Sequence, residues 1–306
     1  MLKTALKLLE KIEEHGFKAY LVGGYVRDYL LNIDSSDIDV TTNATPMDIK
    51  AIFQEAALPH EDYGSITVMI KNVRFEITTF RREITYYNNR KPIEIEYIDD
   101  LLEDLKRRDF TINTLCMNKK GEVLDLLNGK QDIEDKVIRT VGNSYLKFSE
   151  DTLRILRAVR FATNLNFELS NEVKHAILAT KHLLKNLSYE RKRQELDKIF
   201  TSKYVKRGIS LLQELGLDKE LELTKLSQVT IYDDLIGIWA ILDVSDRYPF
   251  TVNEKELMRK IHEAIPLNNL DPQVLYQYGL YVNSIAGSTK GIDKKEITKA
   301  YNALPI

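Results

Sequence analysis

The chain has 306 residues, of which 43% are hydrophobic and 29% are charged, and its formal net charge is -2. This composition is typical of a globular protein of about two domains, and it excludes a mainly disordered chain. The five histidines show no zinc-ligand spacing and the single Cys116 cannot form an internal disulfide, so we expect a reducing, cytoplasmic setting. We expect no membrane segment, because the longest strongly apolar run, residues 235–242, is far too short to span a bilayer.

The chain begins with mixed helical and extended patterns. Leucines and charged residues alternate with helical spacing over residues 2–13, which predicts an amphipathic helix rather than a signal peptide. Short β-type runs follow, and two of them flank Lys71 and Asn72 as in a hairpin. The expected strands are residues 19–22, 37–42, 66–70, 73–78, 111–117 and 122–126.

The pattern changes near Gly142, after which the chain reads as successive helices. We expect helices to begin near Ser149, Asn171, Ser188 and Asn253, because each is a capping-type residue before an apolar period. A mixed first part followed by helices predicts an α+β head followed by an all-α region.

Two glycines, Gly23 and Gly24, stand between the expected strand 19–22 and a helical pattern. A tight turn there would expose the amides at the start of a helix, which bind phosphate, and Arg27 in the first turn would add a fork of donors. Most glycine pairs are only turns, so this motif alone is weak evidence for an anion site.

Asp37 and Asp39 lie two residues apart in an expected strand, so both carboxylates point to the same side. Mg²⁺ prefers such oxygen ligands, and two ions ~4 Å apart can activate a hydroxyl and stabilise a leaving pyrophosphate. Glu76 is a candidate third carboxylate, because it lies between two apolar residues of the run 73–78 and faces away from their side. Taken alone, Asp-x-Asp is more often a turn or an exposed strand face.

Several motifs together resemble the class II tRNA nucleotidyltransferase and bacterial poly(A) polymerase family of the polymerase β superfamily. They occur in the family's order and spacing over roughly the first two thirds of the chain, which makes the set more specific than any single motif. The motifs are LVGGYVRDYLLNIDSSDIDVTTNATP (residues 21–46), EITTFR (76–81), KRRDFTIN (106–113), the pair Asp125 and Gly129, EDTLRILRAVRFA (150–162) and YERKRQEL (189–196).

The resemblance implies an α+β protein whose polymerase-β-like catalytic, metal-binding head, over residues 1–140, is built on a mixed sheet. It also implies a helical neck for base recognition over 141–200 and a helical, RNA-binding body over 201–306. It implies that Asp37 and Asp39 bind two Mg²⁺ ions, and that three residues hold the phosphates and sugar of the nucleotide. These three are Gly24, Arg27 and Arg108.

A further set is carried over less firmly, namely Gly23, Arg107, Asp109, Asn113 and Asp125. Arg107 is a second candidate for the nucleotide, although both arginines of this motif could instead form a surface salt-bridge cluster with the preceding acidic residues. Asp109 is expected to contact the sugar or to be structural. Asp125 is either a brace between head and helices or a turn residue before a glycine.

Asp151, Arg154, Arg157 and Arg160 recur every three residues, so they share one broad helix face. Cytosine and adenine both present an amino donor beside a ring-nitrogen acceptor, whereas uracil and guanine present the reverse. An acceptor from Asp151 and a donor from Arg154 would therefore accept C and A and refuse U and G. The alternative is an Arg-rich helix in which Asp151 caps the start and the arginines are solvated; the resemblance favours the first interpretation.

The expected partner is the 3′ acceptor end of tRNA, with CTP and ATP as substrates. Basic clusters at 106–108, 154–160, 191–193 and 203–207 suit an RNA-binding face, although each alone is also typical of a solvated helix. Family members restricted to CC addition lack a flexible loop after EITTFR, and the full-length segment 81–95 favours addition of A as well. Asn88 and Asn89 stand there where relatives often have an acidic residue.

We therefore predict template-independent addition of C and A to tRNA with release of pyrophosphate. The alternatives are a poly(A) polymerase, an enzyme that adds only CC or A, and a noncatalytic RNA-binding module. A P-loop phosphotransferase is disfavoured by the lack of its glycine-lysine motif. The last residues, YNALPI (301–306), resemble the sequence that precedes the tRNA-gripping tail of the family, so the tail is expected to be naturally short or removed. The oligomeric state is left open.

Overall fold

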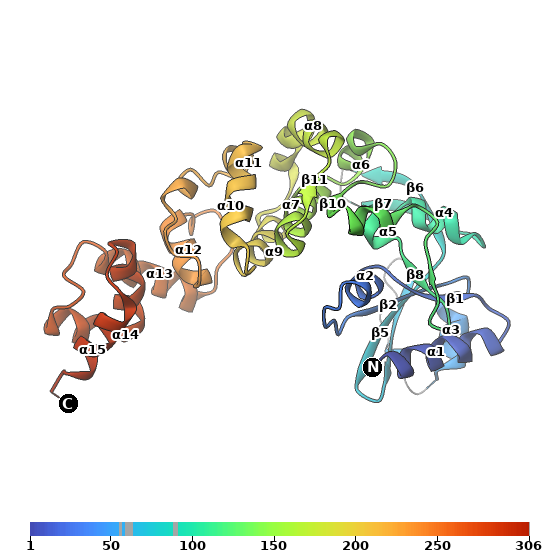
Figure 1. Cartoon of the computed structure of the whole chain (residues 1–306), viewed down its shortest axis with the longest axis horizontal. Helices are drawn as coiled ribbons and strands as arrows, with labels where there is room; N and C mark the ends of the chain where they lie inside the picture. The colour runs from blue at the N-terminus through green and yellow to red at the C-terminus, as the bar shows by residue number, and fades with distance from the viewer. Residues whose placement is uncertain (55–56, 59–63, 88–90, 306) are drawn as a thin grey trace. The chain divides into compact units, whose positions relative to one another are not determined.

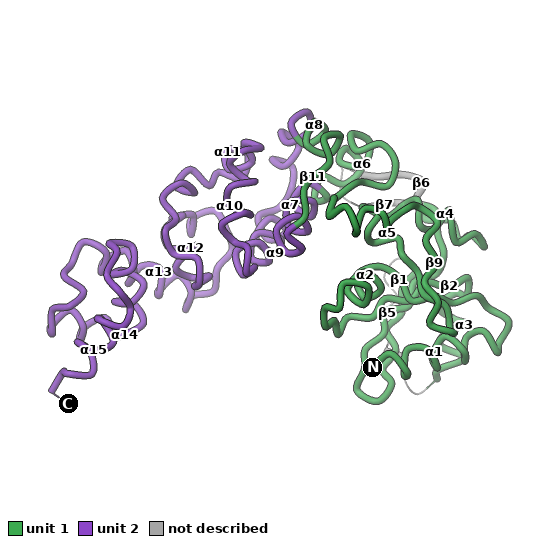
Figure 2. Tube along the Cα trace, viewed as in Figure 1, with its two compact units in different colours: residues 1–154, 167–177 green, residues 155–166, 178–306 purple. Residues whose placement is uncertain are grey.

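The structure is a computed structural model that describes residues 1–54, 57–58, 64–87 and 91–305, with the side chains of all of these except 57–58, 83–87 and 91–94. Figure 1 shows the whole chain, which comprises two compact units that Figure 2 draws in different colours. The first consists of residues 1–154 and 167–177, and the second of residues 155–166 and 178–306. Helices α7 (Leu153–Leu165) and α8 (Asn171–Thr180) each run from the first unit into the second.

The first unit is built on a seven-stranded sheet in the order β3-β4-β5-β2-β1-β8-β9. Strands β2 and β5 are parallel and their other neighbours are antiparallel, so the sheet is mixed, as predicted. The strands of this sheet are β1 Ala19–Val22, β2 Ile38–Thr42, β3 Ala57–Leu58, β4 Ser65–Ile70, β5 Val73–Thr79, β8 Cys116–Met117 and β9 Val123–Leu124.

The two faces of this sheet are covered differently. Helix α1 (Leu2–Glu14) places an apolar stripe that includes Leu8 and Leu9 on one face, and α3 (Pro46–Ile52) packs beside it. Alternate residues of β2 and β5, among them Ile38 and Phe75, join the same core. On the other side, α4 (Leu101–Lys106) packs Leu105 against Val22 and Cys116. The residues between the core positions of β2 and β5 therefore point away from α1.

The expected hairpin at Lys71 and Asn72 is confirmed, since both adopt positive φ between the antiparallel strands β4 and β5. The segment after EITTFR also pairs with itself, as β6 (Arg81–Tyr87) and β7 (Lys91–Tyr97). Asn88 and Asn89 lie outside the described residues.

The expected strand 111–117 is wrong in its first half. Residues Thr111–Asn113 form a 3₁₀ turn, and only Cys116–Met117 is a strand. The side chain of Thr111 donates to Asp132 at 2.5 Å, and Thr114 Oγ1 donates to the Thr111 carbonyl at 2.7 Å. These side-chain hydrogen bonds, one of them to a residue 21 positions later, compete with the β-ladder that strand propensity alone favours.

The expected helix start near Ser149 is also wrong. Asn143 caps α6 (Ser144–Glu150) by accepting from Leu146 N at 3.0 Å, so Ser149 lies inside a helix. The chain then breaks at Asp151, whose extended backbone (φ -138°, ψ 104°) separates α6 from α7. The starts at Asn171 and after Ser188 are confirmed, and the helix expected near Asn253 begins at Val252 after the Thr251 cap.

The described part of the second unit consists of helices and turns, which confirms an all-α region after the head. The remaining short strands, β10 (Val137–Ile138) and β11 (Glu168–Leu169), pair in parallel within the first unit. No helix among the described residues is long and apolar enough to cross a membrane. The other helices are α2 Gly24–Leu30, α5 Gly129–Glu134, α9 Tyr189–Phe200, α10 Val205–Glu214, α11 Leu217–Glu220, α12 Leu235–Leu242, α13 Val252–Ala264, α14 Pro272–Thr289 and α15 Lys294–Asn302, with 3₁₀ turns at Lys181–Asn186 and Leu226–Gln228.

Candidate active site

The candidate metal ligands lie on the sheet face that points away from α1. Asp39 in β2 pairs directly with Glu76 in β5, so the two side chains stand on the same face of neighbouring strands. Asp37 lies one residue before β2 begins. Asp39 is half-buried, whereas Asp37 and Glu76 are exposed. Burial of the alternate residues Ile38 and Phe75 against α1 fixes this orientation.

Gly23 brings the carboxylate face together with the KRRDFTIN motif. It follows β1 directly and has a φ of 78°, a value that residues with a side chain rarely adopt. Its N–H donates to the Leu115 carbonyl at 3.2 Å. A Cβ atom placed on it would lie 3.6 Å from Asp39 Oδ2 and 3.8 Å from Arg108 Nη1. The absence of a side chain therefore lets a carboxylate and a guanidinium approach the same turn.

Arg107 and Arg108 are held by Asp104, a fully buried carboxylate in α4. Arg107 donates from Nε and Nη2 to Oδ1, each at 2.9 Å, and Arg108 Nη2 contacts Oδ2 at 3.4 Å. Thr41 Oγ1 (3.0 Å) and the Arg81 backbone N–H (3.1 Å) complete the set. The salt-bridge cluster that the sequence left as an alternative exists, but it is buried rather than on the surface, and nucleotide binding by Arg107 and Arg108 stays a prediction.

Burial alone would raise the pKa of Asp104, but the two arginines and the Arg81 N–H outweigh it and hold the pKa below its ordinary value. Asp104 was not predicted from the sequence. The available signal was its position in α4, because Asp104 continues the apolar stripe of Leu101 and Leu105 towards Arg108. A carboxylate in such a stripe needs buried cations as partners.

Arg27 is buried in the first turns of α2 and is held by polar partners. Its Nε and Nη2 contact Asp28 Oδ1 at 2.8 and 2.7 Å, and its Nη1 donates to Asn113 Oδ1 at 2.7 Å. Asn113 in turn donates to Asp109 Oδ1 at 3.2 Å, and Asp109 accepts from Phe110 N at 2.8 Å. Asp109 and Asn113 thus hold Arg27 behind the glycine turn, and a contact of Asp109 with the sugar stays a prediction. An added Cβ on Gly24 would lie 3.6 Å from Arg27 Nη2.

The proposed base-reading pair lies at the junction of α6 and α7. Asp151 Oδ1 accepts from Leu153 N at 3.1 Å, so Asp151 caps α7, as the alternative interpretation expected. Arg154 is not solvated, however, since only 7% of it is exposed. Its Nη1 donates to Glu150 Oε2 at 2.8 Å and to the Lys147 carbonyl at 3.0 Å.

The end of α4 connects the KRRDFTIN motif with residues at the junction of α6 and α7. Arg154 Nη2 donates to the Arg107 carbonyl at 3.2 Å, and the buried Lys147 Nζ donates to the Lys106 carbonyl at 2.8 Å. Cations at the carbonyl end of a helix satisfy its last acceptors and oppose its dipole. The residue that is expected to read the base is therefore tied to the motif that is expected to bind the phosphates.

Arg157 and Arg160 lie further along α7, in the second unit. Their guanidinium carbons stand 5.3 and 4.5 Å from the centre of the Phe161 ring. Arg160 Nε also pairs with the buried Glu195 of the YERKRQEL motif at 3.0 Å. Arg160 thus links two motifs inside the second unit, and its contact with a nucleotide stays a prediction.

Asp125 is placed as a helix cap. Its carboxylate accepts from the backbone N–H groups of Gly129 (2.8 Å) and Lys130 (2.9 Å) at the start of α5. This is the turn role that the sequence left open beside that of a brace. A Cβ on Gly129 would lie 2.3 Å from the Thr111 carbonyl oxygen, so the glycine is required by close packing.

Within the part of the chain that the structure describes, no group of three or more His, Cys, Asp or Glu side chains is arranged to hold a metal ion alone. Asp37, Asp39 and Glu76 therefore do not form a closed protein cage. Mg²⁺ is usually held by one or two carboxylates together with water and substrate phosphates, so two carboxylates at an open face fit this ion.

Comparisons with known proteins agree with the motifs. The family described as "Poly A polymerase head domain" matches residues 19–139, and "Probable RNA and SrmB- binding site of polymerase A" matches residues 166–225. The CCA-adding enzyme of Bacillus pumilus is 43% identical over 217 residues, which cover 71% of this chain but only 54% of that protein. The chain thus matches about half the length of this relative.

A longer match extends over nearly the whole chain. The CCA-adding enzyme of Anoxybacillus flavithermus is 34% identical over 336 aligned positions, which cover 99% of this chain and 83% of that protein. The crystal structure of the Bacillus stearothermophilus CCA-adding enzyme in complex with CTP superposes with a TM-score of 0.85 at 28% identity, covering 99% of this chain and 82% of that one. The chain belongs to the family of CCA-adding class II tRNA nucleotidyltransferases and poly(A) polymerases.

Proposed function

We propose that this protein adds C and A to the 3′ end of tRNA, using CTP and ATP and releasing pyrophosphate. The observation that carries the proposal is the approach of Asp39 Oδ2 and Arg108 Nη1 to the same glycine turn, with Glu76 on the next strand. A metal-binding carboxylate and a phosphate-binding guanidinium must be neighbours in a nucleotidyl-transfer site. The relatives named as CCA-adding enzymes support the choice of reaction.

In this reaction the 3′-hydroxyl oxygen of the RNA attacks the α-phosphorus of the nucleotide. A new phosphodiester bond forms, the bond from the α-phosphorus to the bridging oxygen breaks, and pyrophosphate leaves while the hydroxyl loses its proton. No covalent bond to the protein is needed. The protein's task is to orient both substrates and to place positive charge near the phosphates.

Asp37 and Asp39 would hold Mg²⁺, with Glu76 beside them. When bound, the ions supply activation of the attacking hydroxyl and stabilisation of the leaving pyrophosphate. Arg108 would bind the phosphates from a fixed position, because Asp104 holds its guanidinium. Arg27 and Gly24 would present donors at the start of α2, with Gly23 and Arg107 as supports.

Asp151 and Arg154 would choose the base. An acceptor and a donor side by side match the edges of cytosine and adenine, and each good contact contributes about 1–3 kcal/mol of discrimination. The contacts of Arg154 with Glu150 and Arg107 support this role, because they fix the direction of its guanidinium. Arg157 and Arg160 are proposed to continue this face, with residues 141–200 as neck and 201–306 as body. A cytoplasmic setting stays a prediction.

Nucleotide addition to three tRNA transcripts tests the proposal, one lacking the whole CCA end, one lacking CA and one lacking only A. Each is incubated with Mg²⁺ and a single nucleotide, and the products are separated at single-nucleotide resolution. We expect CTP to add two residues to the transcript without CCA and one to the transcript that lacks CA, and ATP to add one residue to the transcript that lacks only A. UTP and GTP should not be incorporated. Incorporation of UTP as readily as CTP would overturn the Asp151 and Arg154 template.

Because a family model of poly(A) polymerase head domains matches this chain, a poly(A) polymerase stays the alternative function. Long A tails on RNAs without an acceptor stem would support that enzyme instead. Addition of only CC or only A would indicate a partial activity. Tight RNA binding with no product under any condition would support the noncatalytic module.

A further inference from the structure

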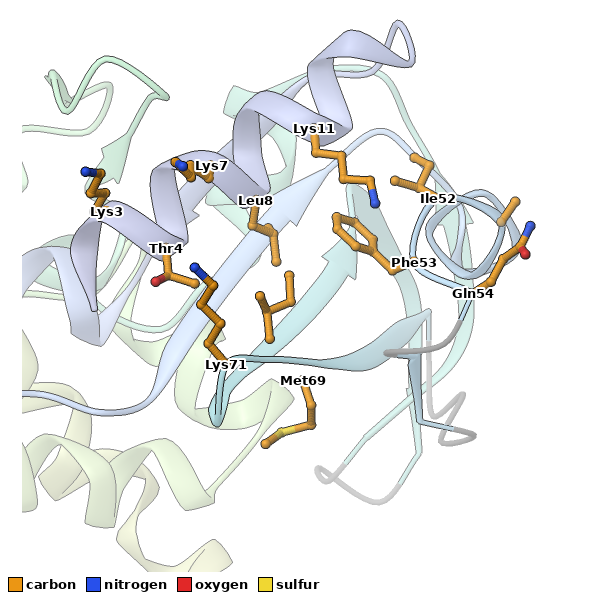
Figure 3. A pocket seen from close by; sticks show the side chains of 12 residues that line it. Lys3, Thr4, Lys7, Leu8, Lys11, Ile52, Phe53, Gln54, Met69 and Lys71 are labelled. Carbon is orange, nitrogen blue, oxygen red and sulfur yellow. The ribbon is translucent and has the colours of Figure 1, made fainter.

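A second charged surface lies on the α1 side of the head sheet. A groove of about 960 Å³ lies between α1, the end of α3 and the β4–β5 turn, and Figure 3 shows the side chains that line it. Four of the residues that line it are lysines, namely Lys3, Lys7 and Lys11 from α1 and Lys71 from the turn. No Asp or Glu from the described side chains lines this groove.

The lysines of α1 also border a hollow on the other flank of the helix. This hollow, of about 400 Å³, shares Lys3 and Lys7 with the groove and adds Lys119 and Lys120; its acidic member is Glu10. Lys3, Lys7 and Lys11 follow one another at intervals of four residues, so they advance about 6 Å along the helix at each step. The lysines are therefore spread along α1 rather than gathered at one point.

Most of these charges are not neutralised within the protein. Lys119 pairs with Glu13 at 2.7 Å, and Lys11 Nζ lies 4.7 Å from the centre of the Phe53 ring. By contrast, Lys3, Lys7 and Lys71 make no ion pair with any described side chain. Lysines of this kind attract phosphates through counterion release, without requiring fixed geometry.

We propose that the lysine groove of α1 binds the phosphate backbone of RNA, as a contact surface separate from the nucleotide site. The spread of charge favours a strand over a compact anion, because successive lysines along α1 match successive phosphates better than one triphosphate. The α1 side of the groove lies on the face of the sheet opposite Asp39 and Glu76, since Leu8 lines it and packs in the core with Ile38 and Phe75. RNA bound here would therefore add affinity without entering the chemistry.

The test measures RNA binding directly, so it does not depend on the proposed function. A fluorescently labelled tRNA transcript lacking its CCA end is titrated with the full chain at several KCl concentrations. The test variant is Lys7→Gln with Lys71→Gln, and the matched control is Lys130→Gln with Lys136→Gln, two exposed lysines of the same unit outside the groove. Circular dichroism and thermal unfolding establish that both variants are folded.

We expect the dissociation constant of the groove variant to rise roughly fivefold to tenfold at ~0.1 M salt, and its salt slope to fall by about 0.7 to 0.9 for each phosphate that the variant no longer neutralises. The control pair should match the wild type. In nucleotide addition, KM for tRNA should rise while kcat and KM for CTP stay unchanged. A groove variant that binds tRNA with the control's affinity and slope overturns the proposal. The proposal is also overturned if the groove variant loses binding of tripolyphosphate but not of tRNA, because that result would indicate a small-anion site.

Discussion

The two faces of the head sheet differ in how their positively charged side chains are held. On the carboxylate face, Arg107 and Arg108 are held by the buried Asp104, and Arg27 is held by Asp28 and Asn113. On the α1 face, the lysines are exposed and gather around a groove. Guanidinium groups fixed by counter-charges can direct hydrogen bonds at atoms that react, whereas mobile ammonium groups create a field that attracts phosphates from a distance. A catalytic site thus needs cations that are fixed by buried partners, whereas a surface that attracts phosphates needs cations that are exposed.

Replacing Asp39 tests the chemistry of the carboxylate face most directly. Asp39→Asn removes a ligand charge but keeps the size of the side chain, and we expect the rate of nucleotide addition to fall on the order of 10³-fold or more. Asp99→Asn, at an exposed carboxylate of the same unit that pairs with Lys18, serves as the control and should retain activity. Single-turnover rates with CTP measure both. Near-normal addition by Asp39→Asn would mean that the metal centre has been assigned wrongly.

A second change asks whether fixed geometry matters on that face. Asp104→Asn leaves two arginines beside a neutral group, and breaking such a buried ion pair costs about 3–5 kcal/mol of the free energy of unfolding. We expect kcat/KM for CTP to fall roughly tenfold to a hundredfold, mainly through KM, because Arg108 loses its anchor. The control is Glu103→Gln on the same helix, whose more exposed ion pairs with Lys106 and Arg82 should leave the free energy of unfolding nearly unchanged.

Chemical denaturation and steady-state kinetics compare the two variants. Equal effects of the changes at Glu103 and Asp104 would remove the distinction between buried and exposed charge.

The glycine turn offers a third test. Gly23 and Gly16 both adopt positive φ, of 78° and 88°, so replacing either with Ala should cost roughly 1–2 kcal/mol of stability. Only Gly23→Ala would place a methyl group near Asp39 and Arg108, because an added Cβ on Gly16 meets nothing within 4 Å. We therefore expect activity to fall in Gly23→Ala alone, measured at a temperature where both variants are folded. Loss of activity in both would point to strain rather than to the site.

The smallest expected effect concerns pH. The pKa of Asp104 is held below its ordinary value of 3.8 in the folded protein, so its ionised form stabilises the fold above that value. This stabilisation is lost as the pH falls through the folded pKa. The difference in melting temperature between the wild type and Asp104→Asn should thus be constant near neutrality and shrink below pH 3.8. A difference that stays constant throughout the acid range would contradict the ion-pair account.

Much of the carboxylate face could be predicted from the sequence. The strand Ala19–Val22 has the predicted bounds, and the alternation around Asp39 and Glu76 correctly gave their shared face. These features depend on period-two burial, which is a local property. The hairpin at Lys71 and Asn72 was equally local, since both residues tolerate the positive φ of a tight turn.

The support of the site could not be predicted in the same way. Asp104 gains its role from Thr41 and the Arg81 backbone, which are distant in sequence and meet it only after folding. Arg154 likewise depends on the Arg107 carbonyl, 47 residues earlier. Thr111 leaves an expected strand because Asp132 provides a competing acceptor. Long-range polar contacts of this kind leave no periodic trace in the sequence.

The only cysteine of the chain, Cys116, can report on the unfolding of the first unit. Cys116 is fully buried beside Val22 and Leu105, and burial raises the pKa of its thiol to about 12. A thiolate-directed reagent therefore reacts only when this unit opens. Labelling followed over time would report the local opening of the first unit separately from the unfolding of the helices in the second unit. The protein can thus be dissected into its two units without introducing a probe.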